Sequence, residues 1–207
     1  MEKILFILIM ILYSNNNFYK NINNTIPIGY DYLVNKNYKL SSNYIPNDLE
    51  SINLEFACEN KYLRKEAKEA FEEMAKSAKK EGLTILAVST FRNYEYQEKL
   101  YNNYVNDLGK FRADIASARA GHSEHQTGLA VDVSDISLDY DNFENTKEFL
   151  WMKENSYKYG FILRYPKAKY DITGFKYEPW HYRYVGISTA KYIFKNNITL
   201  EEYKKMH

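Results

Sequence analysis

The stretch that decides the fold is Gly121–Val133, GHSEHQTGLAVDV, where two histidines and a carboxylate flank a glycine-containing turn. The run after Gly128 alternates like a strand, so Asp132 points away from the face that its valine neighbours share. A carboxylate inside an apolar strand needs a cation or strong hydrogen-bond donors. If the chain reverses at residues 126–128, the His125 imidazole returns over the Asp132 carboxylate. The stretch therefore predicts two of the ligands of a metal site.

A second stretch, Glu178-Pro179-Trp180-His181, offers another carboxylate and another imidazole. Pro179 disfavours helix at Glu178, so this E-x-x-H is not a helical zinc motif. His181 can supply the third ligand of a tetrahedral site together with the imidazole and carboxylate of the first stretch. The fourth position then stays open for water, whose pKa zinc brings to about 7, and Glu178 can accept its proton.

Each candidate residue also has a purely structural interpretation. Taken alone, His125 is more often a surface or core histidine than a ligand, and its combination with the second stretch favours ligation. His122 competes with His125, and spacing does not decide between them. Arg92, at the end of an expected strand, faces a cleft or forms a structural ion pair. We expect Trp180 to pack and fix the geometry of its neighbours, and His207 to be solvated.

Length and net charge limit the classes of protein to which the chain can belong. The chain has 207 residues, which suits one domain with terminal extensions. Its net charge of +1 gives no overall field that would favour nucleic acid, so we expect no nucleic-acid partner. Cys58 is the only cysteine and cannot form an internal disulfide.

The N-terminus predicts export. Residues Ile4 to Tyr13 form an unbroken apolar run, which is shorter than the roughly 20 residues that span a bilayer comfortably. We expect residues 1–14 to be a signal peptide or an uncleaved membrane anchor, the alternative being a buried segment of a cytosolic protein. Residues 15–28 are Asn-rich and predict a tether without a fold, and the domain is expected to span 29–207.

Hydrophobic periodicity and turn residues predict the remaining elements. Helices are expected at 61–81, 93–108, 111–120, 146–159, 188–196 and 200–205. Strands are expected at 83–90, 129–133, 161–163 and 181–185. Helices outnumber strands and the order is not a strict βαβ alternation, which favours an α+β fold with a small, mostly antiparallel sheet and flanking helices.

The two stretches also carry a resemblance. Ser123–Asp132 fits the pattern S-x-H-x-x-G-x-A-x-D, and Glu178–His181 fits E-x-W-H, both in the order found in D-alanyl-D-alanine carboxypeptidases of the VanY type. These belong to a wider metallopeptidase group that also includes lysostaphin and hedgehog domains. The similarity runs from about residue 32 to 186 and includes the tract 159–166, YGFILRYP. It implies the fold of hedgehog domains and D-Ala-D-Ala peptidases.

Carried over by position, the resemblance implies a ligand set and a base. His125, Asp132 and His181 are the implied zinc ligands, and Glu178 is the implied general base. His125 is preferred over His122 because it stands two places after the serine of the first motif.

The resemblance extends to substrate contacts. Arg92 matches an arginine similar in role to an oxyanion stabiliser, and Ser123 and Gln97 match positions that line the substrate pocket. This chain departs from the pattern with Thr90-Phe91, where Gly and Tyr are usual, and with Ala120, where Pro is common. The departures fall on the substrate side and leave the metal motif intact.

The implied function is a zinc metallopeptidase, monomeric and outside the cell, that removes the C-terminal D-alanine from peptidoglycan stem peptides. Alternatives on the same scaffold are an L,D-carboxypeptidase, a peptidoglycan endopeptidase, and a zinc-containing binding module without catalysis. Two histidines and a carboxylate also describe the facial triad of iron oxygenases. Such sites need no counterpart of Glu178, and the short H-x-D spacing usual for them is missing here.

Overall fold

The computed structural model describes residues 19, 21–139 and 142–207. The expected signal or anchor at 1–14 lies outside the described residues, as does most of the first half of the expected tether. Within the described ranges, the helices are all too short or too polar to cross a bilayer.

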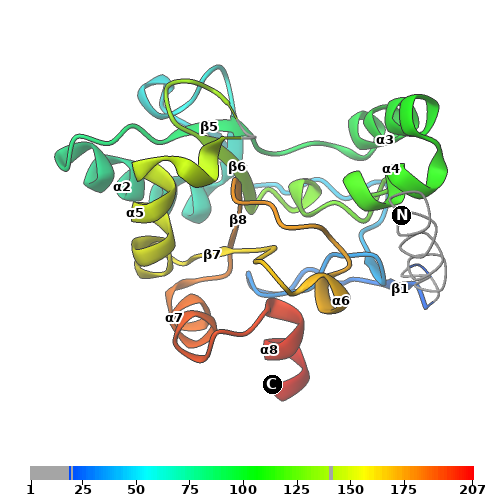
Figure 1. Ribbon diagram of the computed structural model, residues 1–207. Helices are drawn as coiled ribbons and strands as arrows, with labels where there is room; N and C mark the ends of the chain where they lie inside the picture. Colours follow the sequence, from blue (N-terminus) through cyan, green and yellow to red (C-terminus); the bar gives the residue numbers. More distant parts are fainter. Residues whose placement is uncertain (1–18, 20, 140–141) are drawn as a thin grey trace, which may run out of the picture.

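A four-stranded antiparallel sheet forms the centre of the fold (Figure 1). Its spatial order is β5 (Leu86–Ser89), β6 (Ala130–Ser134), β8 (His181–Tyr184) and β7 (Phe161–Leu163). Together with the helices around it, this sheet confirms the predicted α+β class. In the register of β6 with β8, Asp132 stands directly opposite His181, so both side chains emerge on the same face.

Two smaller sheets lie outside the centre. β3 (Leu49–Ser51) pairs antiparallel with β4 (Tyr62–Arg64), and β1 (Asn23–Asn24) pairs parallel with β2 (Tyr38–Lys39). β1 falls in the segment where the sequence predicted a tether without a fold. Its pairing uses backbone groups, as in the 2.7 Å bond from the amide of residue 23 to the carbonyl of residue 37, so side-chain composition gave no sign of it.

The long helices begin and end close to where their signals predict. α3 (Tyr94–Leu108) starts after Asn93, whose side chain accepts the amide of Tyr96 at 2.8 Å, and it stops at Gly109. α2 (Lys65–Lys80) starts later than predicted, because the three residues before it pair with β3 as β4. The expected helix at 146–159 divides into α5 (Lys147–Asn155) and a 3-10 turn, η4 (Ser156–Tyr159).

The remaining helical elements are short. They are η1 (Leu54–Phe56), α4 (Lys110–Ala116), η2 (Glu124–Thr127), η3 (Phe143–Asn145), α6 (Tyr170–Thr173), α7 (Ile187–Asn196) and α8 (Leu200–Met206). The 3-10 turns and α6 were not predicted, because elements of three or four residues show no periodicity.

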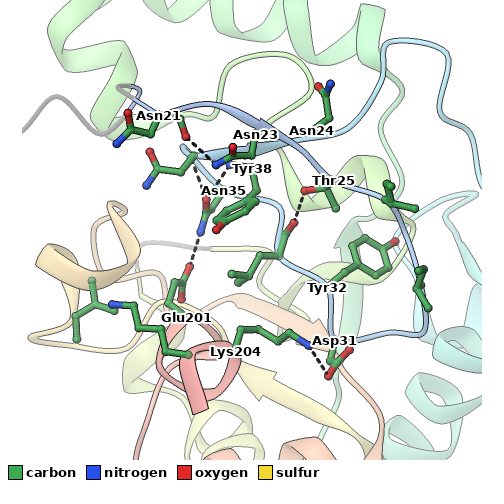
Figure 2. Close-up of a pocket in the computed structure, with 16 residues that line it drawn as sticks. Asn21, Asn23, Asn24, Thr25, Asp31, Tyr32, Asn35, Tyr38, Glu201 and Lys204 are labelled. Carbon is green, nitrogen blue, oxygen red and sulfur yellow. Dashed lines mark hydrogen bonds and ion pairs between the residues drawn. The ribbon is translucent and has the colours of Figure 1, made fainter. Parts of the chain in front are cut away.

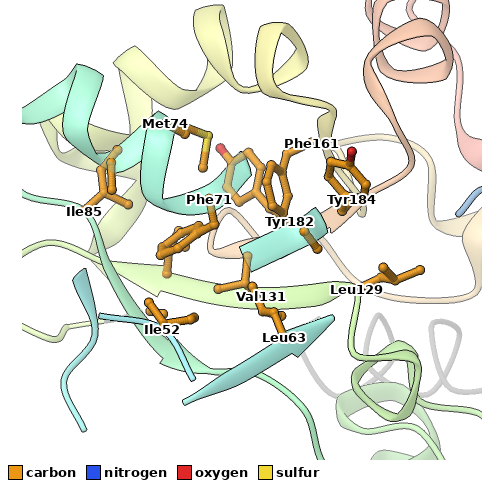
Figure 3. Packing of buried hydrophobic residues seen from close by; sticks show 14 of the residues in the cluster. Ile52, Leu63, Phe71, Met74, Ile85, Leu129, Val131, Phe161, Tyr182 and Tyr184 are labelled. Atoms are coloured by element: carbon orange, nitrogen blue, oxygen red, sulfur yellow. The ribbon is translucent and has the colours of Figure 1, made fainter. Parts of the chain in front are cut away.

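The hydrophobic core lies on the face of the sheet that α2 covers (Figure 3). Phe71 and Met74 of α2 are fully buried against Val131 and Tyr182 of the central strands, and the rings of Phe71 and Phe161 meet edge to face with centroids 6.3 Å apart. Because strand side chains alternate, the residues between these core positions point to the opposite face. The helices α3 and α4 flank that second face (Figure 1). It carries polar residues, among them Asp132 and His181, that line a shared cavity.

Phe71→Ala tests the core. Removing a fully buried ring leaves a cavity, so we expect the free energy of unfolding to fall by about 3–5 kcal/mol, measured by urea denaturation. The control Leu150→Ala, at a side chain that is 58% exposed on α5, should change it by less than about 1 kcal/mol. Equal effects of the two substitutions would contradict this placement of the core.

Candidate metal centre

Three side chains from two distant parts of the chain converge on the polar face of the sheet. His125, Asp132 and His181 are all buried, and each offers a ligand atom within 4.8 Å of the others. His125 Nε2 lies 3.2 Å from Asp132 Oδ2, and His181 Nδ1 lies 2.8 Å from Asp132 Oδ1. Two imidazole nitrogens and a carboxylate oxygen in this arrangement are the donor set that zinc takes in catalytic sites.

The turn that returns His125 to Asp132 depends on its flanking residues. Ser123 Oγ accepts the backbone amide of His125 at 3.3 Å and so starts η2. Gly128 ends η2 in the left-handed region at φ +67°, where a Cβ would lie 2.9 Å from Leu49 Cδ2. The predicted reversal is therefore present, and a residue other than glycine would be strained at its last position.

The partners of the two imidazoles determine which nitrogens face Asp132. His125 Nδ1 lies 2.7 Å from the Thr90 carbonyl oxygen, which can only accept, so Nδ1 donates and Nε2 is left for a metal. In His181 the roles are reversed, because Nδ1 faces Asp132 while Nε2 lies 3.4 Å from Glu124 Oε2. Outer partners of this kind orient metal-binding histidines in known sites, so the residues fit a zinc ion.

Charges around the centre favour a cation. Although burial raises the pKa of Asp132, the two histidines hold it well below its usual range, so the carboxylate is ionised. Burial and the nearby Arg92 lower the pKa of His125 to about 4, which keeps its imidazole neutral and able to ligate. Burial opposes the charged form of His181, but hydrogen bonds with Asp132 and Glu124 raise its pKa to about 9. The carboxylates thus favour positive charge at this point.

Glu178 lies beside the centre as a separate carboxylate. It lines the same cavity as the three candidate ligands but is not one of the grouped metal-binding residues. Burial raises the pKa of Glu178 to about 7, so the group can take up and release a proton near neutral pH. Its backbone is held by bonds from its amide to the Tyr165 carbonyl and from the His181 amide to its own carbonyl, both 3.2 Å.

The cavity at the centre has a volume of about 350 Å³ and contains most of the predicted site residues. Arg92 and Ser123 line it, and the buried Arg92 Nε has no hydrogen-bond partner among the described residues. Gln97 is not among the described residues that line it. The Gln97 amide donates instead to Ala118 O at 2.7 Å and Ser117 Oγ at 3.3 Å, and so supports a segment that forms the wall.

The structure also identifies wall residues that the sequence did not single out. The Tyr165 ring stacks on His181 with centroids 4.9 Å apart, and Tyr104 and Leu108 of α3 line the cavity. Tyr165 falls inside the tract of the resemblance, whereas the α3 residues had no signal beyond helix packing. Phe175 and Lys176 complete the wall from a loop that no pattern marked.

Two other features, His122 and a second cavity, lie outside the candidate metal centre. His122 Nδ1 lies 2.8 Å from the Asn35 carbonyl, and its ring meets the edge of Tyr19, so it does not join the metal group. A larger cavity of about 700 Å³ lies between the N-terminal asparagines and α8 (Figure 2). It contains none of the predicted site residues, so size alone does not identify the centre.

Comparisons with known proteins agree with this geometry. The family model described as "VanY: D-alanyl-D-alanine carboxypeptidase" matches residues 60–187. The chain belongs to this VanY family. The three candidate ligands, Glu178 and Arg92 all fall inside the matched region.

Three similar proteins illustrate the family. The putative carboxypeptidase YodJ of Bacillus subtilis is 49% identical over 178 residues, 83% of this chain and 65% of that protein. The solved LdcB LD-carboxypeptidase is 48% identical with a TM-score of 0.79, covering 84% of both chains. A VanY D,D-pentapeptidase mutant in complex with Zn(II) is 32% identical with a TM-score of 0.72, covering 84% of this chain and 98% of the other. The chain spans 65%, 44% and 50% of the first three curated relatives it matches.

Metal analysis of purified variants tests the ligand set. We expect about one zinc per chain in the wild type, and loss of the metal in His125→Ala, because only two of three ligands remain. His122→Ala should retain zinc, since this histidine lies outside the grouped residues. Zinc loss in His122→Ala with retention in His125→Ala would exchange the roles of the two histidines.

Proposed function

We propose that this chain is a zinc metallopeptidase that removes the C-terminal D-alanine from peptidoglycan stem peptides. The observation that carries the proposal is the convergence of His125, Asp132 and His181 beside Glu178, a carboxylate that stays outside the ligand set. A purely structural metal has no use for such a group. Membership of the VanY family supports the substrate class, and its Zn(II)-bound relative supports the metal.

His125 Nε2, His181 Nδ1 and an oxygen of Asp132 would hold the zinc. When bound there, the ion supplies Lewis acidity, which polarises a peptide carbonyl and makes water more acidic. Glu178 accepts a proton from the attacking water as the new C–O bond forms. It then gives that proton to the leaving nitrogen of the D-alanine as the C–N bond breaks.

Arg92 and Ser123 act on the substrate rather than on the proton. The Arg92 Nε, buried and without a partner among the described residues, can donate to the carbonyl oxygen as negative charge develops on it. Ser123 contributes a hydroxyl to the cavity wall at the start of η2. Aromatic and aliphatic residues of the wall can enclose the small apolar methyl of D-alanine.

The proposal includes two candidates for the bond that is cleaved, a D,D-bond and an L,D-bond. A D,D-carboxypeptidase accords with the family description and with the VanY D,D-pentapeptidase. The 48% identity to the LdcB LD-carboxypeptidase favours the L,D activity as the second candidate. Since the D,D- and the L,D-activity both take stem peptides as substrate, we propose that the enzyme works outside the membrane, on the same side as its substrate.

Digestion of defined muropeptides tests the function. We expect mass spectrometry to show loss of a single D-alanine, from the pentapeptide for a D,D-enzyme or from the tetrapeptide for an L,D-enzyme. A chelator should abolish the reaction, and added zinc should restore it. Cleavage inside the stem would establish an endopeptidase instead, and no cleavage by the zinc-loaded chain would support a binding module.

Glu178→Ala separates the base from the ligands. We expect zinc content to stay at the wild-type level while kcat falls by about 10²–10⁴-fold, the usual contribution of a positioned proton acceptor. His181→Ala should lose both zinc and activity. Wild-type turnover in Glu178→Ala would remove this residue from the mechanism.

The pH dependence follows from the raised pKa of Glu178. The base works as the ionised carboxylate, so kcat/KM should fall as pH falls through its pKa, which burial raises to about 7. A bound zinc ion favours the ionised form and moves the midpoint of this acidic limb below 7. Because Lys176 also lowers the pKa of Glu178, Lys176→Met should raise the midpoint at low ionic strength. An unchanged midpoint in Lys176→Met would assign the limb to another group.

A further inference from the structure

A buried carboxylate that the proposed chemistry does not use lies directly behind the metal centre. The Glu124 side chain is completely shielded from solvent. Its Oε1 accepts hydrogen bonds from Arg164 Nε at 2.8 Å and from Arg183 Nη1 at 2.9 Å. Its Oε2 lies 3.4 Å from Nε2 of His181. One oxygen thus serves the two arginines and the other serves a candidate zinc ligand.

This division determines the tautomer of His181. Glu124 Oε1 accepts hydrogen bonds from two guanidinium groups, which can only donate, so the carboxylate faces its partners as an acceptor. Nε2 of His181 must therefore carry the proton that points to Oε2. The lone pair of the neutral ring is then on Nδ1, which faces Asp132 at 2.8 Å. Nδ1 is the nitrogen on the side where the metal would lie.

The carboxylate is not free to turn away. Arg164 also forms two bonds to Glu201 of α8, at 2.8 and 2.6 Å, and Asn35 donates to the same Glu201 at 3.0 Å (Figure 2). Arg183 is anchored by a 3.1 Å bond to the Tyr32 carbonyl. Two arginines and two glutamates balance in charge, and each guanidinium is fixed by groups on its far side.

We propose that Glu124 is a positioning residue that holds His181 as the Nε2–H tautomer, so that Nδ1 is available to the metal. The inference rests on the proposed zinc site. Arg164 and Arg183 hold Glu124 directly, whereas Glu201 and the Tyr32 carbonyl contact only the far sides of these arginines. If Glu124 served only to neutralise the two arginines, its loss would affect stability and leave zinc affinity unchanged.

Glu124→Gln is the decisive substitution, because an amide cannot satisfy both sides. If its oxygen faces the arginines, its NH₂ faces His181 and requires an acceptor at Nε2, which is the opposite tautomer. If its oxygen faces His181, its NH₂ meets two guanidinium groups that can only donate. We therefore expect zinc affinity to fall by about 10- to 100-fold, measured by competition with a chromogenic chelator in the absence of peptide.

Glu201→Gln is the matched control. Glu201 is a second buried carboxylate that binds Arg164. Unlike Glu124, it has no hydrogen bond to His181 among the described residues. We expect a lower thermal unfolding temperature with zinc affinity close to that of the wild type. Equal weakening of zinc binding in the two variants would indicate general loosening of the network and would overturn the proposal.

Nitrogen-15 NMR of histidine-labelled, zinc-loaded wild type gives a direct readout that needs no variant. We expect His181 to show a protonated Nε2 and a metal-shifted Nδ1, whereas His125 should show the reverse pattern. Coordination of His181 through Nε2, or wild-type zinc affinity in folded Glu124→Gln, would overturn the inference even if the chain cleaves muropeptides normally. A zinc-binding chain with the expected tautomers but without peptidase activity would contradict the proposed function alone. Failure to bind zinc would overturn both.

Discussion

The antiparallel pairing of β6 with β8 is the constraint on which the rest of the structure depends. It sets Asp132 opposite His181, although the two residues are 49 positions apart in the chain. A shift of one residue in this register would turn one of the two side chains into the hydrophobic core and leave the other without its partner. The packing of Val131 and Tyr182 under α2 therefore maintains the candidate metal centre as well as the core.

A second constraint is the burial of charge beneath this pair. Ionised groups with no exposure to water are costly, and arginine–glutamate clusters are often no more stable than apolar replacements. Here the cluster around Glu124 is balanced in charge and reaches from His181 to Asn35 and Glu201. Its geometry suits orientation of a ligand better than it suits stability.

The proposed general base and the candidate ligand carboxylate differ because their surroundings differ. Asp132 has two histidines as partners and is held ionised, whereas Glu178 stands at the cavity wall with its pKa raised by burial. The first environment suits a metal ligand, and the second suits a group that accepts and returns a proton near neutral pH. Arg92 lines the same cavity, and its Nε is a donor that has no hydrogen-bond partner among the described residues. The cavity thus combines the groups that the proposed hydrolysis of a peptide bond requires.

The sequence by itself determined the residue types of the site, the strands that carry them and the α+β class. Alternation around Asp132, the glycine turn after His125 and the Pro179 break are local signals, and local signals are visible in a linear chain. The tertiary structure, in contrast, groups His125 and not His122 with the other candidate ligands, places Gln97 behind the cavity wall, and sets Glu124 against His181. These outcomes depend on contacts between residues that are far apart in the sequence. An example is the hydrogen bond between His125 Nδ1 and the Thr90 carbonyl oxygen. Such contacts leave no periodic pattern in the sequence, because each arises only when separate segments pack together.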